Sequence, residues 1–210
     1  MGVGPIIIQG DGTKCRTMYD MARWQPNASE RLVLAALDLF AERGYENTTV
    51  IEIAERAGLT KSTFFRHFPD KREVLFGGQD MHARLLVDAI TAAPNPATPL
   101  EAVGAALDAI TATFTDDRRQ FSARLRPVIA GNSELQERAA FKRSRLAGAM
   151  TDALLKRGVP EPTASLAAEL GIRAFYRAFD QWADPANQQT FTELTRHALD
   201  DLRAATATLD

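Results

Sequence analysis

A stretch of twenty residues, TVIEIAERAGLTKSTFFRHF, constrains the fold of this chain more than any other segment. It occupies residues 49–68. Apolar residues recur at helical spacing on both sides of Gly58, so the stretch predicts a helix, a tight turn and a second short helix. Phe64 and Phe68 lie four residues apart and are expected to face inward. The outer face of the second helix would then carry Lys61, Ser62, Phe65 and Arg66.

Capping signals predict where the helices of residues 27–76 begin and end. Three pairs have the spacing of a capping box or its acidic analogue: Asn27 with Glu30, Thr49 with Glu52, and Asp70 with Glu73. Gly44 and Gly58 stand where a residue of positive φ would close the first two helices. We therefore expect helices at about 29–43, 50–57, 61–68 and 71–93.

Helical patterning continues to the end of the chain, interrupted by prolines. The expected helices are 100–114, 115–131, 133–157, opened by Ser133, 162–183, and a last one after Pro185 that ends near Ala207. This makes nine helices and no convincing strand, an all-α architecture. The expected organisation is a flexible arm over 1–26, a helix-turn-helix domain over 27–76 and a second helical domain over 77–210. The arm could instead lie along DNA, because it carries basic residues.

The charge of the chain is concentrated locally. The 210 residues carry a formal charge of −2, so nucleic-acid binding requires a local basic patch. Residues 56–72 supply one, with basic side chains at Arg56, Lys61, Arg66, Lys71 and Arg72. The alternative is that these charges form an ordinary solvated helix face.

Other function classes find little support in the sequence. Cys15 is the single cysteine, which excludes an intrachain disulfide and a cysteine-based zinc cluster and suits a reducing cytoplasm. His67, His82 and His197 are scattered without metal-ligand spacing. Since no nucleophile motif or phosphate-binding glycine loop occurs in a credible context, we expect no enzyme, no metal and no cofactor. No apolar run approaches the roughly 20 residues that cross a bilayer.

The segment RLVLAALDLFAERGYENTTVIEIAERAGLTKSTFFRHFPDKREVL, residues 31–75, resembles the DNA-binding domain of the tetracycline-repressor (TetR) family. The nine-helix layout and the chain length are also similar to that family. The resemblance implies a homodimer that binds a partly palindromic double-stranded operator and represses nearby genes until a small effector binds the second domain. It names neither the operator, nor the effector, nor the regulated genes.

Carried over position by position, the resemblance implies these DNA contacts: Thr49, Thr60, Lys61, Ser62, Thr63, Phe65, Arg66, His67 and Lys71. Thr49 and His67 would touch phosphates, and Lys71 would hold the DNA backbone together with a helix N-terminus. Phe65 stands where tyrosine is common, so it should make apolar contacts instead of a hydrogen bond. Arg66 becomes the best candidate for reading guanine.

The second domain carries two further sets of candidates. A cavity for a hydrophobic or amphipathic effector could be lined by Phe114, Phe121, Phe141, Met150, Phe175 and Phe179, although core packing explains them equally well. By resemblance, a dimer interface would use Leu166, Leu170, Ala174, Phe191, Leu194, Ala198, Leu199 and Leu202. The alternative is that these residues close the core of the monomer. The arginines at 118, 119, 124 and 126 could pair with an acidic ligand or simply be solvated.

Two adjacent glycines, Gly77 and Gly78, predict a break just after the DNA-binding domain. A hinge and a close packing contact are equally good interpretations. Two other function classes stay open: a DNA-binding or partner-recruiting dimer without a ligand, and, more remotely, a helical enzyme. Activation in place of repression also remains open, because the sign depends on where the operator lies.

Overall fold

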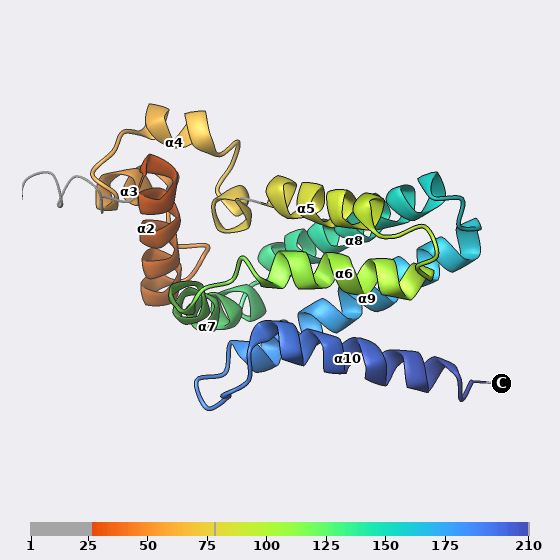
Figure 1. Ribbon diagram of the computed structural model, residues 1–210. Helices are drawn as coiled ribbons and strands as arrows, with labels where there is room; N and C mark the ends of the chain where they lie inside the picture. Colours follow the sequence, from red (N-terminus) through yellow and green to blue (C-terminus); the bar gives the residue numbers. More distant parts are fainter. Residues whose placement is uncertain (1–26, 78, 210) are drawn as a thin grey trace, which may run out of the picture.

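The computed structural model describes residues 27–77 and 79–209 (Figure 1), and within them the chain is entirely helical, as predicted. Nine α-helices and one 3-10 helix, η1, make up this part of the chain. Their bounds are α2 Ala28–Arg43, α3 Val50–Arg56, α4 Lys61–His67, η1 Arg72–Phe76, α5 Gln79–Ala92, α6 Pro99–Thr111, α7 Asp116–Ala130, α8 Ser133–Lys156, α9 Glu161–Trp182 and α10 Phe191–Thr206. The predicted N-terminal arm, residues 1–26, lies outside the described residues.

The predicted caps of the first two helices are formed. The Asn27 side chain accepts from the Glu30 amide at 3.0 Å, and the Glu30 carboxylate accepts from the Asn27 amide at 3.2 Å. The Thr49 hydroxyl accepts from the Glu52 amide at 3.2 Å, and the Glu52 carboxylate accepts from the Thr49 amide at 2.8 Å. These reciprocal bonds satisfy amides that have no partner inside the helix.

The expected single helix over 71–93 is wrong. The chain forms η1 first, and α5 begins only at Gln79. Gly77 separates them in an extended conformation, φ −59° and ψ 148°, which interrupts the helical hydrogen-bond ladder. Glycine permits this break because it has a low helix propensity.

The start of one other helix also differs from the prediction. Asn132, and not Ser133, caps α8, since its side chain accepts from the Leu135 amide at 3.1 Å. The last helix lies after Pro185 as predicted and begins at Phe191, where Thr190 and Glu193 form a capping box.

The chain packs around two hydrophobic cores. In Figure 1, α2, α3 and α4 form a compact unit at one end, while α5, α6, α8, α9 and α10 run side by side away from it. The core of this second group contains Leu107, Met150 and Phe175. The core of the first group contains Phe64 and Phe68 and also takes in residues of α8, namely Leu135 and Ala139. The DNA-binding domain of the prediction therefore does not close its core alone.

A nearly buried ionic cluster holds η1 on α8. The Glu73 side chain is 12% exposed, and its carboxylate binds Lys142 at 2.9 Å and also Arg138. Lys142 is itself buried. Because each charge would be costly to bury without its partners, the cluster fixes the position of η1. Next to it, the Tyr45 hydroxyl donates to Glu134 at 3.1 Å.

We expect Glu73→Gln to lower the free energy of unfolding by about 2–3 kcal/mol, because it leaves Lys142 buried without a counter-charge. Asp200→Asn is the matched control, since the Asp200–Arg203 pair is about two-thirds exposed on both sides, and it should change stability by less than about 0.5 kcal/mol. Urea unfolding followed by circular dichroism measures both. Equal effects of the two substitutions would contradict the role given to the cluster.

Candidate nucleic-acid interface and effector cavity

Helices α3 and α4 form a helix-turn-helix whose turn is held by α2. Gly58 has φ 64°, and the Leu59 amide donates to the Ala54 carbonyl at 2.8 Å. The Arg31 guanidinium of α2 donates to the carbonyl of Ala57 at the end of α3. Glycine is favoured at position 58 by this positive φ, and a Cβ there would lie 2.8 Å from Arg31 Nη2 and displace the end of that side chain.

The outer face of α4, defined here by Lys61, Ser62, Phe65 and Arg66, is exposed as predicted, and the inner face is buried. Phe64 and Phe68 are 0% and 4% exposed, whereas Phe65 is 48% exposed. Thr60 caps the helix by accepting from the Thr63 amide at 3.1 Å. The inner aromatic pair thus anchors a short helix whose other side faces outward.

The remaining predicted contacts on this helix are accessible to different degrees. Thr60 and His67 are exposed, and Thr63 is half-buried. The Lys61 ammonium lies 6.0 Å from the centre of the Phe65 ring. Within residues 27–77 and 79–209, neither Lys61 nor Arg66 forms an ion pair.

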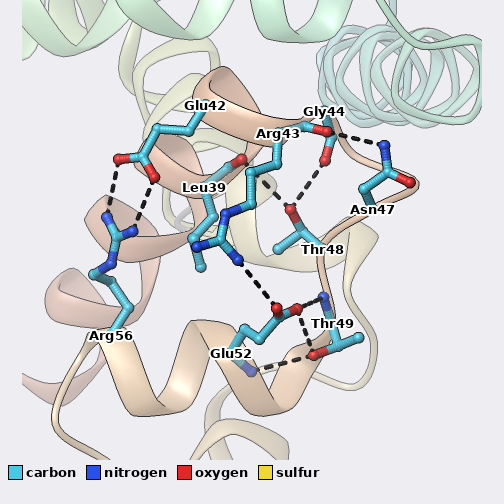
Figure 2. Close-up of polar contacts among 9 residues, drawn as sticks. All are labelled: Leu39, Glu42, Arg43, Gly44, Asn47, Thr48, Thr49, Glu52 and Arg56. Atoms are coloured by element: carbon cyan, nitrogen blue, oxygen red, sulfur yellow. Dashed lines mark hydrogen bonds and ion pairs between the residues drawn. The ribbon is translucent and has the colours of Figure 1, made fainter.

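The predicted basic patch is smaller than the sequence suggests. The Arg56 guanidinium donates to both carboxylate oxygens of Glu42, at 3.0 and 2.8 Å (Figure 2). The hydrogen bond from Arg56 lowers the pKa of Glu42 and keeps it charged. Arg72 pairs with Asp70 at 3.2 Å. Because Arg56 and Arg72 already have carboxylate partners, the free positive charge is concentrated on α4.

Lys71 does not occupy the predicted phosphate-binding position. Its ammonium points into the protein, where it donates to the carbonyls of Tyr45 at 2.8 Å and Thr48 at 3.0 Å. It also lies 3.9 Å from the centre of the Tyr45 ring. These contacts satisfy carbonyls of the loop before α3, so in this structure Lys71 stabilises the loop.

Thr49 is exposed at the start of α3, but its donors are occupied (Figure 2). Its amide and hydroxyl both donate to the Glu52 carboxylate, each at 2.8 Å, and Arg43 binds the same carboxylate at 3.1 Å. A phosphate at this position would have to replace Glu52 as the acceptor. The loop is further ordered by Thr48, whose hydroxyl donates to the Gly44 carbonyl at 2.9 Å.

A cavity of about 1530 Å³ opens between the two parts of the molecule. Four of the six predicted cavity residues line it: Phe114, Phe121, Phe175 and Phe179. The prediction is wrong for the other two. Phe141 is 51% exposed and lies under Arg138 on the outer surface, while Met150 is fully buried in the core against Gly171.

The helix-turn-helix part, α2 to α4 together with η1, supplies one wall of this cavity. Val33 and Leu34 of α2 line it, as do Leu75 and Phe76 of η1. Leu34 is 40% exposed, and Met81 of α5, which also lines the cavity, is 59% exposed. These exposed apolar side chains are consistent with an apolar rim to the opening. A bound molecule would therefore touch both parts of the protein.

Most of the predicted dimer residues belong to the core of the monomer. Ala174, Phe191, Leu194 and Ala198 are all at most 5% exposed within the single chain. Leu199 and Leu202 pack against the same core. The apolar residues at helical spacing on α9 and α10 form the core of the monomer, because these two helices pack on each other and on α6. Leu166, at 56% exposed, and the half-buried Leu170 remain available to a partner.

Three of the four arginines considered for an acidic ligand have partners in the protein. Arg119 donates to the carbonyl of Asp184 at 2.8 Å, Arg124 pairs with Asp38, and Arg126 pairs with Asp180 at 3.0 Å. The fourth is Arg118, which lies over the Phe114 ring at 5.5 Å.

The hinge hypothesis is tested only at its first glycine, because residue 78 lies outside the described residues. A Cβ at Gly77 would lie 3.2 Å from the Phe68 ring. That distance is tighter than ordinary contact, which favours a close packing contact at Gly77.

The three histidines lie in separate places. His67 is exposed on α4, His82 lies in the cavity wall 5.6 Å from the Phe114 ring centre, and His197 is exposed on α10. Burial, with a smaller contribution from Arg118, lowers the pKa of His82. Over the described ranges no group of His, Cys, Asp and Glu could hold a metal ion, and none of the helices there has the length and apolarity to span a bilayer.

Several contacts of the site could not be predicted from the sequence. Arg31 contacts Ala57, Glu73 contacts Lys142, and Arg143 contacts the Tyr176 ring. Each contact joins two distant segments, and no local spacing signals it. Tyr176 falls next to Phe175 on α9 and could have been included with it, because both lie within the same aromatic run.

Comparison with known proteins agrees with this geometry. The family profile described as "Bacterial regulatory proteins, tetR family" matches residues 32–76. The transcriptional regulator TcmR of Streptomyces glaucescens is 36% identical over 87 residues, which are 41% of this chain and 38% of TcmR. The transcriptional activator FasR of Mycolicibacterium smegmatis is 34% identical over 68 residues, 32% of this chain and 31% of FasR. The matches thus span about a third of these relatives.

Solved structures extend the likeness to the whole fold. A protein from Mesorhizobium loti assigned to the TetR family superposes with a TM-score of 0.50 at 20% identity, covering 87% of this chain and 98% of its own. Another from Syntrophomonas wolfei gives a TM-score of 0.57 at 17% identity, covering 87% of this chain and 96% of its own. Fold and site together define a helix-turn-helix domain joined to a helical second domain. Residues 32–76 of this chain match the TetR family of bacterial regulatory proteins.

Lys71→Met should lower the free energy of unfolding by about 2–3 kcal/mol, because it removes two charge-assisted hydrogen bonds and leaves two loop carbonyls without their donor. Lys61→Met serves as the control and should stay within about 0.5 kcal/mol, since Lys61 is exposed and unpaired within the described ranges. Urea denaturation of the purified variants measures the difference. Unchanged stability of Lys71→Met would show that its ammonium is free after all.

Proposed function

We propose that this protein is a ligand-responsive DNA-binding regulator of transcription, which acts as a homodimer on a palindromic operator, most simply as a repressor. One observation carries the proposal. The outer face of α4 presents an exposed phenylalanine and two cations that form no ion pair with any described residue, while the aromatic residues behind it are buried in the core. DNA lies in the bacterial cytoplasm, so we place the protein there.

The outer face of α4 has the chemistry that reading the major groove requires. A guanidinium binds the O6 and N7 atoms of guanine in two parallel hydrogen bonds, which assigns sequence reading to Arg66. Phe65 suits a thymine methyl group. Lys61 lies in the first turn of α4, where it can reach a phosphate together with the exposed hydroxyls of Thr60 and Ser62.

Two such faces are needed for useful affinity. A single face offers few phosphate contacts, because Arg56, Arg72 and Lys71 are bound within the protein. Each phosphate contact contributes to the salt-dependent part of binding, and a second copy doubles their number. A two-fold dimer also accounts for a palindromic operator, because it sets two α4 helices at a fixed separation.

The cavity supplies a physical basis for ligand response. Its wall includes α2 and η1 of the DNA-binding part, and η1 is fixed on α8 by Glu73. A hydrophobic or amphipathic molecule that fills the cavity changes the packing of both parts. Such a ligand couples to DNA affinity when it binds one arrangement of α2 and η1 better than the other.

Selection of bound sequences from random duplex DNA tests the main proposal, and we expect a palindromic consensus. On that consensus, Arg66→Ala should relax preference at one base pair in each half-site, at a cost of about 1–3 kcal/mol. Lys61→Ala should weaken all sequences alike and reduce the salt dependence by about one counterion per face. Arg203→Ala on α10 is the neutral control. If Arg66→Ala and Lys61→Ala weaken every operator variant equally, the reading role of Arg66 is wrong.

The dimer is tested by the mass of the protein in solution. Light scattering should give twice the 23.0 kDa chain mass, and Leu166→Glu should shift it toward the monomer, since it places a charge on an apolar contact. Ile51→Glu changes an equally apolar residue, 47% exposed on α3, and should leave the mass unchanged. If Leu166→Glu remains dimeric, the interface does not include Leu166. A monomeric wild type would refute the dimer.

A further inference from the structure

Arg143 of α8 is a cation in the cavity wall and has no counter-ion among residues 27–77 and 79–209. Its guanidinium carbon lies 4.5 Å from the centre of the Tyr176 ring, and both residues line the cavity. Its neighbours Arg138 and Lys142 are bound to Glu73. Within the described part of the chain, Arg143 itself makes no ion pair and no hydrogen bond. Its donors are therefore available to a ligand.

Tyr176, whose ring lies under this guanidinium, adds a neutral donor to the cavity wall. Burial raises the pKa of its hydroxyl, and the nearby Arg143 opposes this only in part, so the group stays protonated at neutral pH. No hydrogen-bond partner of the hydroxyl occurs among residues 27–77 and 79–209. The guanidinium lies over the face of the Tyr176 ring, and the donors of both groups suit charge-assisted and neutral hydrogen bonds to an anion in the cavity.

The acidic residues of the cavity wall are already compensated. Asp180 pairs with Arg126 at 3.0 Å, and Glu30 accepts from the Asn27 amide in the cap of α2. Asp117 lies in the first turn of α7, where a helix N-terminus stabilises negative charge. These carboxylates therefore do not compete for Arg143.

The rest of the cavity is aromatic and apolar. The ring centre of Phe114 lies 5.9 Å from that of Phe175 and 6.3 Å from that of Phe179. Leu107 and Ile110 extend the same wall. The volume of about 1530 Å³ exceeds the roughly 300–1,000 Å³ of common ligand sites, so the cavity can take a bulky molecule.

We propose that the ligand is an organic anion, whose acidic group binds Arg143 and Tyr176 and whose apolar body lies against Phe114, Phe175 and Phe179. The inference rests on the proposed function in treating this molecule as the effector. Its binding does not require DNA, so the two ideas can fail separately.

The test uses two fluorescent probes with similar apolar bodies. Anilinonaphthalene sulfonate carries an anion, and N-phenylnaphthylamine is neutral. Both affinities are measured by fluorescence titration of the purified full chain. Arg143→Gln should lower the affinity for the sulfonate probe about tenfold, the effect of one lost charge-assisted bond. It should leave the affinity for the neutral probe within about twofold of wild type. Arg145→Gln is the matched control, since Arg145 is exposed on the same helix and does not line the cavity.

Further variants separate the assignment from its alternatives. Tyr176→Phe should weaken the sulfonate probe alone, by a smaller factor. Arg143→Lys keeps the charge but loses the planar guanidinium, so its affinity for the sulfonate probe should lie between those of wild type and Arg143→Gln. If circular dichroism shows that Arg143→Gln does not fold, Arg143→Lys takes its place in the test. Displacement of the sulfonate probe by decanoate, decyl phosphate and decanol then distinguishes a carboxylate from a phosphate and from a neutral alcohol.

The contrary outcomes are specific. Equal loss of both probes in Arg143→Gln, no loss, or a loss that follows Arg118→Gln instead would overturn the anion site. So would a wild type that does not bind the sulfonate probe. A protein that binds the probe through Arg143 but selects no DNA sequence would keep this inference and refute the regulatory function.

Discussion

The positions of the helix-turn-helix and the cavity both depend on the packing of η1 against α8. Val74, Leu75 and Phe76 enter a core that α8 completes with Leu135 and Ala139, and Glu73 beside them is held by two cations. This short helix joins the two parts of the chain, so its position determines where the helix-turn-helix lies relative to the cavity. A core that takes residues from both parts resists their separation, since separation would expose apolar surface and leave charges unpaired.

The same contact brings the cavity next to the DNA-binding part. Leu75 and Phe76 face the cavity, whereas Glu73, two and three residues before them on the same short helix, binds α8. A molecule in the cavity therefore meets side chains that also form the core behind α4. Protein interiors are packed too densely to deform continuously, so such a contact favours one of a few discrete arrangements. The proposed regulation requires that these arrangements differ in DNA affinity.

Charge is distributed by tertiary pairing more than by composition. In sequence, residues 56–72 hold five basic groups. In the fold, Arg56 and Arg72 bind carboxylates and Lys71 binds loop carbonyls. Among the described residues, the positive charge of this segment that has no such partner is thereby confined to α4. The same reasoning applies to the second group of helices, where Asp180 neutralises Arg126 while Arg143 has no ion-pair partner among the described residues.

The all-α class, the caps at Asn27 and Thr49, the positive φ at Gly58 and the inward side of α4 all followed from the sequence, because each depends on residues within about four positions. The contacts of Lys71 with the loop before α3, of Glu73 with α8 and of Arg143 with the Tyr176 ring did not, since they join segments distant in the sequence. The apolar residues at helical spacing on α9 and α10 correctly predicted that most of these residues are buried. They did not predict whether the burial occurs inside one chain or between two copies, because both arrangements require the same spacing. Sequence by itself determined the helices and the face of α4. Only the tertiary structure decided which charges stay free and that the cavity borders the DNA-binding part, because both depend on contacts between distant segments.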